Sequence, residues 1–156
     1  MIEQAKLKQL LHYDQLTGEF TWIGNGVKAG FKDKDGYIII KVCGRPYRAH
    51  LLAFLFMTGK MPKKADHKDN VRDNNAWLNL RECNDSQNAQ NALIRSDNTS
   101  GVKGVYWNKQ LKRWVVRIMV NNKRKSCGTY AKLEDAERAA QVAREYYHKD
   151  FANHGV

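Results

Sequence analysis

Hydrophobic and polar positions predict a short helix, two strands and a second helix in the first half of the chain. Apolar side chains fit a short helix over residues 2–11, and a turn within 16–22 leads into a strand. The β-branched run over 37–42 predicts a further strand. Residues 49–58 are apolar on almost every side, as in a short buried helix, and Gly59 suits the left-handed position at its end.

The second half follows the order strand, strand, strand, helix. Strands are predicted over 102–107, 113–120 and 123–128, with a turn at 121–122 between the last two. A helix over 133–147 follows, and small side chains on one of its faces would let it lie close against a sheet. The residues on that face are Leu133, Ala136, Ala140, Ala143 and Tyr147.

The middle strand of this half alternates clearly, and alternate side chains of a strand point to opposite faces of a sheet. The side chains expected to face the helix are Trp114, Val116 and Ile118. Those expected on the open face, toward solvent or a ligand, are Arg113, Val115, Arg117 and Met119.

A run of turn-forming residues separates the two halves, and we place a linker at 95–100 between modules over 1–94 and 101–156. The chain carries 27 Lys and Arg against 16 Asp and Glu, a net charge of +11. Residues 1–94 hold 14 basic and 10 acidic side chains, whereas 95–156 hold 13 and 6. This excess favours a polyanionic partner, with nucleic acid ahead of an anionic membrane and the second module as its main contact.

Other features exclude several classes of protein. No apolar run reaches the roughly 18 residues of a membrane-spanning helix, and the first residues do not read as a secretory signal. The cysteines Cys43, Cys83 and Cys127 are scattered, which fits a reducing cytosol and structural thiols better than disulfides or a zinc site. Neither a membrane nor an obligate protein partner is evident.

The stretch over 65–88 is dense in Asp, Asn and His, which are potential oxygen and nitrogen ligands. Leu78, Leu80 and Cys83 are expected to anchor it in a core, and Asp85 suits the N-cap of a helix that follows. The pattern predicts a short strand, a long polar loop, a short strand and a helix. That order would bring the end of the first strand near the first turn of the helix.

In that arrangement Asp66 and Asn88 offer two hard oxygen ligands to one divalent ion, with His67 beside it. Oxygen ligands without thiolates favour Mg²⁺ or Mn²⁺ over Zn²⁺. The set suits phosphodiester hydrolysis, because a neutral imidazole can take a proton from water while a metal stabilises charge on the phosphate. Residue types alone do not exclude the alternative that this stretch is an ordinary polar turn, since Asp-His pairs and Asn-rich loops are common.

The spacing supports a sharper interpretation, because six anchors follow one another along the first module: Gly36-Tyr37, Ala49-His50, Gly59-x-x-Pro62, Asp66-His67, Asn79-Leu80-Arg81 and Asn88. The series resembles the HNH endonuclease family, most closely its phage and intron-encoded homing branch, over about residues 7–94. The resemblance implies the ββα-metal fold, one Mg²⁺ or Mn²⁺ per active site, and a phage- or mobile-element-encoded enzyme in a cytoplasm. It also implies that His67 is the general base, that Asp66 and Asn88 hold the metal, and that Asn79 braces the loop without reacting.

Two positions depart from the family pattern. His50 is followed by Leu51 where the family usually has Arg, and the loop lacks the Arg of the usual Asp-Asn-Arg. Each change removes a cation that could contact a phosphate, so that role passes to other arginines: Arg45, Arg48, Arg72 or Arg81. The role of His50 stays open, and we favour a packed histidine over an active one.

The second module has a resemblance of its own, carried by Ser100-Gly101-Val102, Trp114, Gly128-Thr129-Tyr130 and the alanine-rich helix. It is similar to the Apetala-type DNA-binding domain of plants and of some phage HNH enzymes. A sheet that presents arginine can enter the major groove, where Arg binds guanine through two hydrogen bonds. The predicted DNA contacts are Arg113 and Arg117, then Tyr106, Asn108, Arg124 and Ser126, with Lys123 on a phosphate.

The leading interpretation is an α+β DNA endonuclease, with a ββα-metal HNH module followed by a small three-stranded antiparallel sheet packed on one helix. Its partner is double-stranded DNA, in which each active site would make one nick. Two alternatives stay open: a non-catalytic DNA-binding regulator that retains an HNH scaffold, and a nuclease without sequence preference.

Overall fold

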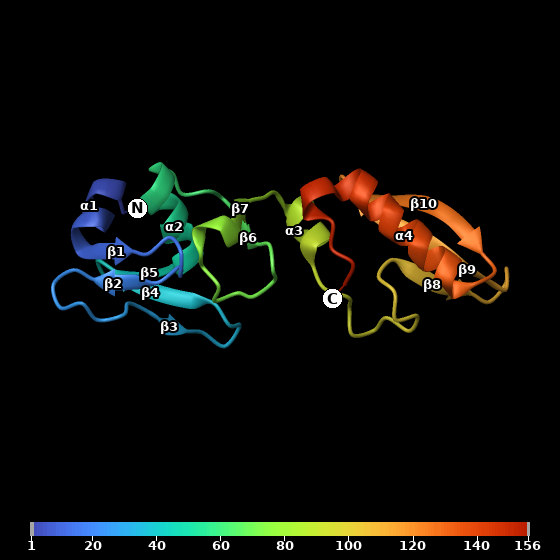
Figure 1. Ribbon diagram of the computed structural model, residues 1–156, viewed down its shortest axis with the longest axis horizontal. Helices are drawn as coiled ribbons and strands as arrows, with labels where there is room; N and C mark the ends of the chain where they lie inside the picture. Colours follow the sequence, from blue (N-terminus) through green and yellow to red (C-terminus); the bar gives the residue numbers. More distant parts are fainter. Residues whose placement is uncertain (1, 156) are drawn as a thin grey trace. The chain divides into compact units, whose positions relative to one another are not determined.

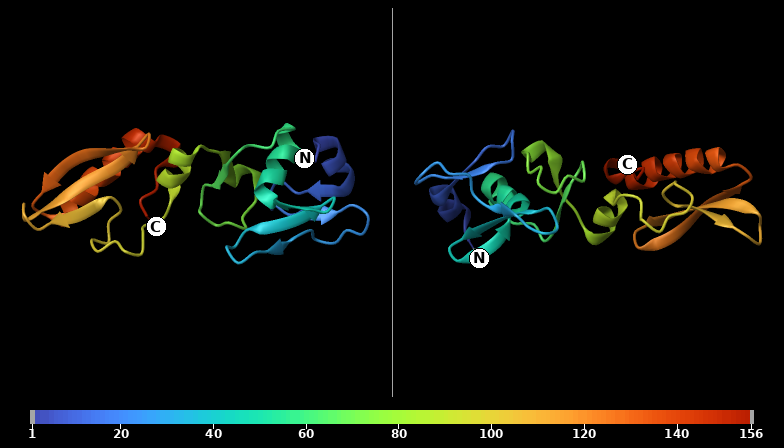
Figure 2. Two further views of the ribbon diagram at one scale, coloured as in Figure 1. Left: turned by 180° about the vertical axis from the view of Figure 1, so that it is seen from behind. Right: turned by 90° about the horizontal axis from the view of Figure 1, so that it is seen from below.

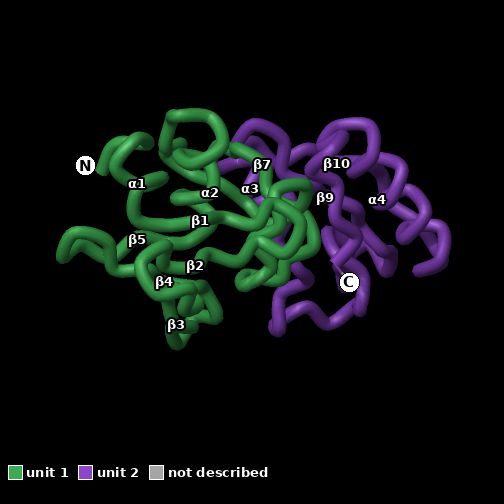
Figure 3. The backbone as a smooth tube through the Cα atoms, turned by 60° about the vertical axis from the view of Figure 1, so that its left-hand side comes forward, with its two compact units in different colours: residues 1–84 green, residues 85–156 purple. Residues whose placement is uncertain are grey.

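The structure is a computed structural model that describes residues 2–155, and the chain divides into two units, 1–84 and 85–156 (Figure 3). Strands pair antiparallel throughout the described residues, and helices are interspersed with small sheets (Figures 1 and 2). The predicted α+β class is therefore confirmed. Between residues 2 and 155 no helix combines the length and the apolar character that crossing a bilayer requires.

The first unit is built from short elements arranged in two hairpins and a three-stranded sheet of order β3-β4-β5. Strand β1 pairs with β2, and β6 pairs with β7. The elements are α1 (Gln4–Leu10), β1 (Leu11–Tyr13), β2 (Phe20–Trp22), β3 (Phe31–Lys32), β4 (Ile38–Val42), β5 (Arg45–Arg48), α2 (Ala49–Thr58), β6 (Ala65–His67), the 3-10 turn η1 (Trp77–Asn79) and β7 (Leu80–Glu82).

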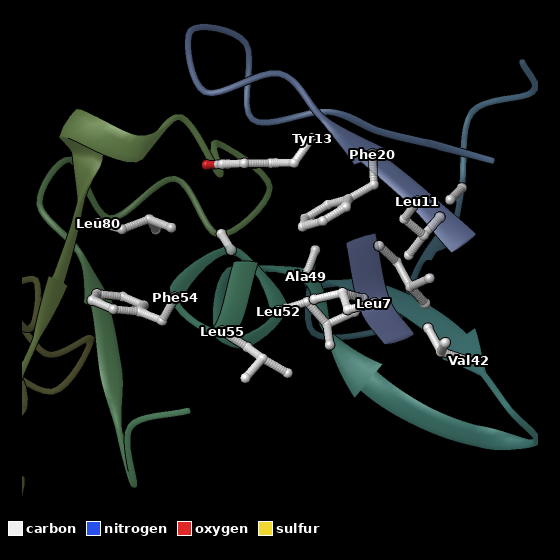
Figure 4. Close-up of a cluster of buried hydrophobic side chains, with 13 residues drawn as sticks. Leu7, Leu11, Tyr13, Phe20, Val42, Ala49, Leu52, Phe54, Leu55 and Leu80 are labelled. Carbon is white, nitrogen blue, oxygen red and sulfur yellow. The ribbon is translucent and has the colours of Figure 1, made fainter. Parts of the chain in front are cut away.

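Helix α2 lies among the core side chains of the first unit (Figure 4). Leu52 of α2 is fully buried together with Leu7 and Leu11 from the N-terminal segment. The predicted buried helix is thus confirmed, and it ends where expected. Gly59 follows it in the left-handed region (φ 76°), and its amide donates to the Leu55 carbonyl at 3.0 Å.

The polar stretch forms the predicted strand, loop, strand and helix, but one of its expected anchors is on the surface. Leu80 and Cys83 are buried, whereas Leu78 is 80% exposed, so the prediction for Leu78 was wrong. The tight turn η1 explains the difference, because side chains three residues apart align in a 3-10 helix. Trp77 and Leu80 therefore share the inner side, where Trp77 packs against the core, and Leu78 points outward.

The second unit is a three-stranded sheet of order β10-β9-β8 that packs on helix α4 (Figure 1). Val105 and Val116 of the sheet bury against Ala136 and Ala140 of the helix, as the alanine stripe predicted. The elements are α3 (Asp85–Asn91), β8 (Val105–Asn108), β9 (Arg113–Val120), β10 (Lys123–Tyr130), α4 (Leu133–His148) and the 3-10 turn η2 (Lys149–Phe151).

The two faces of β9 follow the predicted alternation with one exception. Val116 and Ile118 are buried, while Arg113, Arg117 and Met119 are exposed. Val115 was expected on the open face but is only 3% exposed. Its register partners explain the burial, because Tyr106 of β8 and Thr129 of β10 lie on either side of it across the sheet.

A half-buried amine connects the end of helix α3 to the rest of the second unit. Lys103 Nζ donates to the carbonyls of Gln90 and Ala92 at the end of the helix, and to the carbonyl of Asn153 at 3.1 Å. The Arg144 guanidinium, which is 1% exposed, in turn donates to the Lys103 carbonyl. Burial, followed by the charge of Arg144, lowers the pKa of Lys103 to about 8. The boundary between the units thus lies before α3, upstream of the linker that the sequence suggested.

Candidate active site

The predicted metal ligand Asp66 and the predicted base His67 are consecutive residues of strand β6, which pairs with β7. In its register Asp66 lies opposite Arg81, and His67 lies opposite Leu80. Successive side chains of a strand point to opposite faces, so the two groups are directed to different surroundings. His67 is 4% exposed and lies against the core side, while Asp66 meets the side chain of Arg81.

One hydrogen bond fixes which nitrogen of His67 carries the proton. Its Nε2 lies 3.1 Å from Asn75 Oδ1, and Asn75 Nδ2 donates to the Asp73 carbonyl at 3.2 Å. Because the amide nitrogen is used by Asp73, the oxygen faces the imidazole and Nε2–H must be the donor. In this tautomer Nδ1 is the basic nitrogen of the ring.

Asn75 is itself held by the β1–β2 hairpin. Tyr13 Oη donates to the Asn75 carbonyl at 2.7 Å in a buried contact, and the Trp77 amide donates to the Gln15 carbonyl at 2.9 Å. Gly18 (φ 77°) packs so closely that a Cβ there would lie 2.1 Å from the Asn75 carbonyl carbon. Burial, and then the charge of Asp14, raises the pKa of Tyr13 to about 12, so its hydroxyl stays a donor.

Sequence reasoning missed the contact of Asn75 with His67. Asn75 is 2% exposed although it lies in a stretch of polar residues. A buried amide within a loop follows no periodicity, and its partners Tyr13 and Gly18 are distant in the sequence. The sequence does contain one indication, Gly18 in the β1–β2 hairpin, but its close approach to Asn75 becomes apparent only in the folded structure.

Asn79 connects three points of the loop between β6 and β7. Its Nδ2 donates to Asp69 Oδ1 at 2.9 Å and to the Asn74 carbonyl at 2.8 Å, and its Oδ1 accepts from the Asp69 amide. Burial would raise the pKa of Asp69, but hydrogen bonds from Val71, Asn74 and Asn79 outweigh it and lower the pKa. A carboxylate that stays charged keeps this part of the loop closed.

Asp66 is paired with Arg81 across the ribbon. Arg81 Nη2 and Nε lie 3.0 and 3.3 Å from Asp66 Oδ2, and both side chains are largely buried, at 12% and 11% exposure. Both nitrogens bind the same oxygen. The carboxylate can therefore serve a cation through its other oxygen, and contact of Arg81 with DNA stays a prediction.

The donor set predicted for a divalent ion consists of carboxylate and amide oxygens. No group of three or more His, Cys, Asp or Glu that could hold a metal occurs in residues 2–155. Asp66 and Asn88, as a hard oxygen pair, fit an ion such as Mg²⁺ that keeps several waters. Asn88 is exposed on α3, in the second unit, so its partnership with Asp66 stays a prediction.

His50 lies beside His67 in the core of the first unit. The two rings are edge to face with centroids 4.9 Å apart, and His50 is 3% exposed. Burial lowers the pKa of His50 to about 3, with smaller contributions from His67 and Arg48. His50 is thus neutral at ordinary pH and packs one edge of the His67 ring.

The open face of the second sheet carries most of the predicted DNA contacts. Arg113 and Arg117 are exposed on β9, and the Arg117 guanidinium lies 5.3 Å from the Tyr106 ring. Arg124 of β10 is in register with Met119 and so shares this face. Lys123 is in register with Val120 and points the other way, which separates it from the arginines.

These features define an α+β protein with a histidine-centred polar site in one unit and an arginine-bearing sheet in the other. The model of the HNH endonuclease family matches residues 47–90, and that of the AP2 domain matches residues 100–149. Protein 3.8 of Escherichia phage T7 is 30% identical over 107 residues, which cover 67% of this chain and 88% of that protein. The chain belongs to the HNH endonuclease family and carries an AP2 domain after the HNH region.

A solved structure is also similar to this chain. It belongs to a study of DNA binding and cleavage by the HNH homing endonuclease I-HmuI. The match has 22% sequence identity and a TM-score of 0.45, and it covers 90% of this chain and 86% of that one.

Proposed function

We propose that the protein is a divalent-metal-dependent DNA endonuclease that hydrolyses one phosphodiester per active site in duplex DNA. The observation that carries this is the buried hydrogen bond between His67 and Asn75, which holds the ring of the predicted base in a defined orientation. Family membership and the AP2 domain support DNA as the substrate. A single base per chain is consistent with a nick in one strand.

His67 would take the proton from the attacking water through Nδ1, and the positive charge that forms would be shared with Asn75 Oδ1. Asn79 and Asp69 would hold the loop that carries Asn75 in place. Asp66 and Asn88 would hold the Mg²⁺ or Mn²⁺, and a bound ion supplies charge stabilisation at the phosphate and the leaving oxygen. In the second unit Arg113, Arg117, Arg124 and Tyr106 would hold the duplex, with Lys123 on a phosphate and Arg72 near the nuclease site.

Nicking of supercoiled plasmid tests the proposal. With Mg²⁺ or Mn²⁺ the purified protein should convert the plasmid to the open circle, and a chelator should stop it. His67→Ala should lower the rate by about 100-fold or more, since general bases contribute about 10²–10⁴-fold. His67→Gln, which conserves a polar side chain in the buried position, should be similarly slow, and both should still bind duplex DNA. Cutting without metal, or full activity in both variants, would contradict the mechanism.

One observation favours a second candidate, a DNA-binding regulator that does not cut. The carboxylate of Asp66 is already paired with Arg81 and is largely buried. If the positive charge of Arg81 keeps a cation away from Asp66, the HNH region serves only as a scaffold. Duplex binding with no plasmid nicking at any Mg²⁺ or Mn²⁺ concentration would favour this function, and Arg81→Gln would then be the variant to test for recovered cutting.

A further inference from the structure

Two arginines stand over one aromatic ring next to His67. The guanidinium carbon of Arg48 lies 4.1 Å from the centroid of the Tyr37 ring, and that of Arg72 lies 5.2 Å from it. Both distances are within the range of a cation–π contact. The Tyr37 ring lies 6.1 Å from the His67 ring, so both cations are one aromatic ring away from the proposed base.

Both guanidinium groups keep donors for a further acceptor. Within residues 2–155 neither Arg48 nor Arg72 forms an ion pair with a carboxylate, and both are exposed. Arg72 donates from Nη1 to the Asp35 carbonyl at 2.8 Å, which fixes its direction while most of its five N–H donors remain. Stacking on a ring holds a guanidinium plane in place without using its N–H groups.

The position of Arg48 adds to the positive potential. It is the N-cap residue of α2, whose first turn contains no acidic residue. The amino end of a helix carries a partial positive charge, so the guanidinium and the helix end favour an anion at the same place.

We propose that Arg48 and Arg72, held on the Tyr37 ring, form a clamp for a backbone phosphate of the DNA strand next to His67. The proposal rests on the nuclease function above and assigns to this pair the phosphate contact for which the family pattern usually supplies other arginines. Two planar donors on one ring suit the tetrahedral oxygens of a phosphodiester, which guanidinium groups bind through paired hydrogen bonds.

The other arginines near the site are less suited to this role. Arg81 is engaged by Asp66, with 12% of its side chain exposed. Arg45, at the start of β5, borders a surface cavity with Ile2, Lys6 and Cys43, on the side of the N-terminal segment. Arg45 therefore offers a control for the clamp, since it is an exposed arginine on the same hairpin as Arg48.

The test compares the salt dependence of duplex binding in chelator for two double variants of the full chain. Arg48→Gln/Arg72→Gln removes the clamp, and Lys41→Gln/Arg45→Gln removes the same charge from two exposed positions of the β4–β5 hairpin. Each phosphate contact contributes about −0.9 to the slope of log K against log salt, so loss of the one clamped phosphate should flatten the slope by about 0.9 in the first variant. The second should change it by less than half as much. Equal slopes in the two variants would overturn the clamp.

Tyr37 provides a second comparison. Tyr37→Phe keeps the ring and should leave the slope unchanged, whereas Tyr37→Leu should flatten it in the direction of the double arginine variant. Equal slopes for Tyr37→Phe and Tyr37→Leu would contradict the role of the Tyr37 ring in holding the two arginines. The binding measurements need no cutting, so they test the clamp independently of the nuclease function. If the protein fails to nick plasmid, the proposed nuclease function is wrong, and the slopes still decide whether the clamp exists. If plasmid is nicked, the clamp variant should lose at least tenfold more activity than the hairpin control.

Discussion

At the scale of single residues, the proposed role of His67 as a base depends on its contact with Asn75. A neutral histidine exists as two tautomers, and only the one with Nε2–H leaves Nδ1 as the base. Asn75 selects that tautomer with an acceptor that is itself fixed at both ends, by Asp73 and by Tyr13. The catalytic role that the sequence assigns to His67 thus depends on a residue that it did not single out.

Replacement of Asn75 tests this dependence. Asn75→Ala should slow single-turnover nicking by about 10- to 100-fold, because the His67 ring loses the hydrogen bond that fixes its orientation as a general base. It should also lower the free energy of unfolding by about 1–3 kcal/mol, because the Asp73 carbonyl loses a buried partner. The ¹⁵N chemical shifts of the His67 imidazole would report its tautomer. If Asn75 had only a structural role, its replacement would leave these shifts unchanged.

Asn75→Asp is the matched comparison, since it keeps an oxygen acceptor at the same position. It should preserve the Nε2–H tautomer in the ¹⁵N spectrum and retain more activity than the alanine variant. A His67 tautomer that is identical in all three proteins would contradict the role given to Asn75, whatever happens to stability.

At the scale of elements, the local pattern of hydrophobic and polar residues correctly predicted the helices, strands and turns that are long or uniform in residue type. The β-branched run became β4, the apolar run became α2, and Asn121 and Asn122 both adopt the left-handed turn conformation between β9 and β10. Strand β3, with only two residues, follows no detectable period, because its pairing with β4 is set by tertiary contacts.

The two wrong burial predictions each have a physical cause that the local pattern does not contain. Leu78 was expected inside because it is apolar, but the 3-10 geometry of η1 directs it outward. Val115 was expected outside because of strand alternation, but neighbours on both sides cover it. In the site, Asp66 and His67 could be located from spacing, whereas Arg81 as partner of Asp66 required the register of two strands separated by a long loop.

Helix α3 gives the prediction at this scale. Lys103→Met should lower the free energy of unfolding of the second unit by about 2 kcal/mol, because backbone carbonyls of Gln90, Ala92 and Asn153 lose a charged donor. Amide hydrogen exchange in α3 should accelerate accordingly. Lys109→Met, a change at an exposed lysine of the same unit, is the control and should leave both measurements near wild type. Unchanged exchange in α3 after loss of Lys103 would contradict the anchor.

At the scale of the whole molecule, the exposed sheet arginines and the closed polar loop belong to different units. The second unit presents Arg113 and Arg117 on an open sheet face, whereas the polar loop of the first unit is closed by its own Asp and Asn side chains. On the proposed function, affinity for DNA and the chemistry on it would be carried by different parts of the sequence.

Loss of the sheet arginines should therefore alter where DNA is cut more than whether it can be cut. Arg113→Gln and Arg117→Gln should each weaken binding to a preferred duplex by about tenfold, the scale of one bidentate base contact. Mapped nicks should spread over more positions. Arg138→Gln on α4, an exposed arginine paired with Asp135, is the control. An unchanged map of cleavage ends in both sheet variants would count against base recognition by this face.

The anchor of α3 also bears on how genes for such proteins can recombine. The HNH match extends to residue 90, yet the unit that includes the AP2 domain begins at residue 85, so the two overlap on α3. A crossover in the segment 95–100 would give α3 a new neighbour without the amine that holds its carbonyls. We expect viable exchanges to join upstream of α3, so that Asn88 and Lys103 are inherited together.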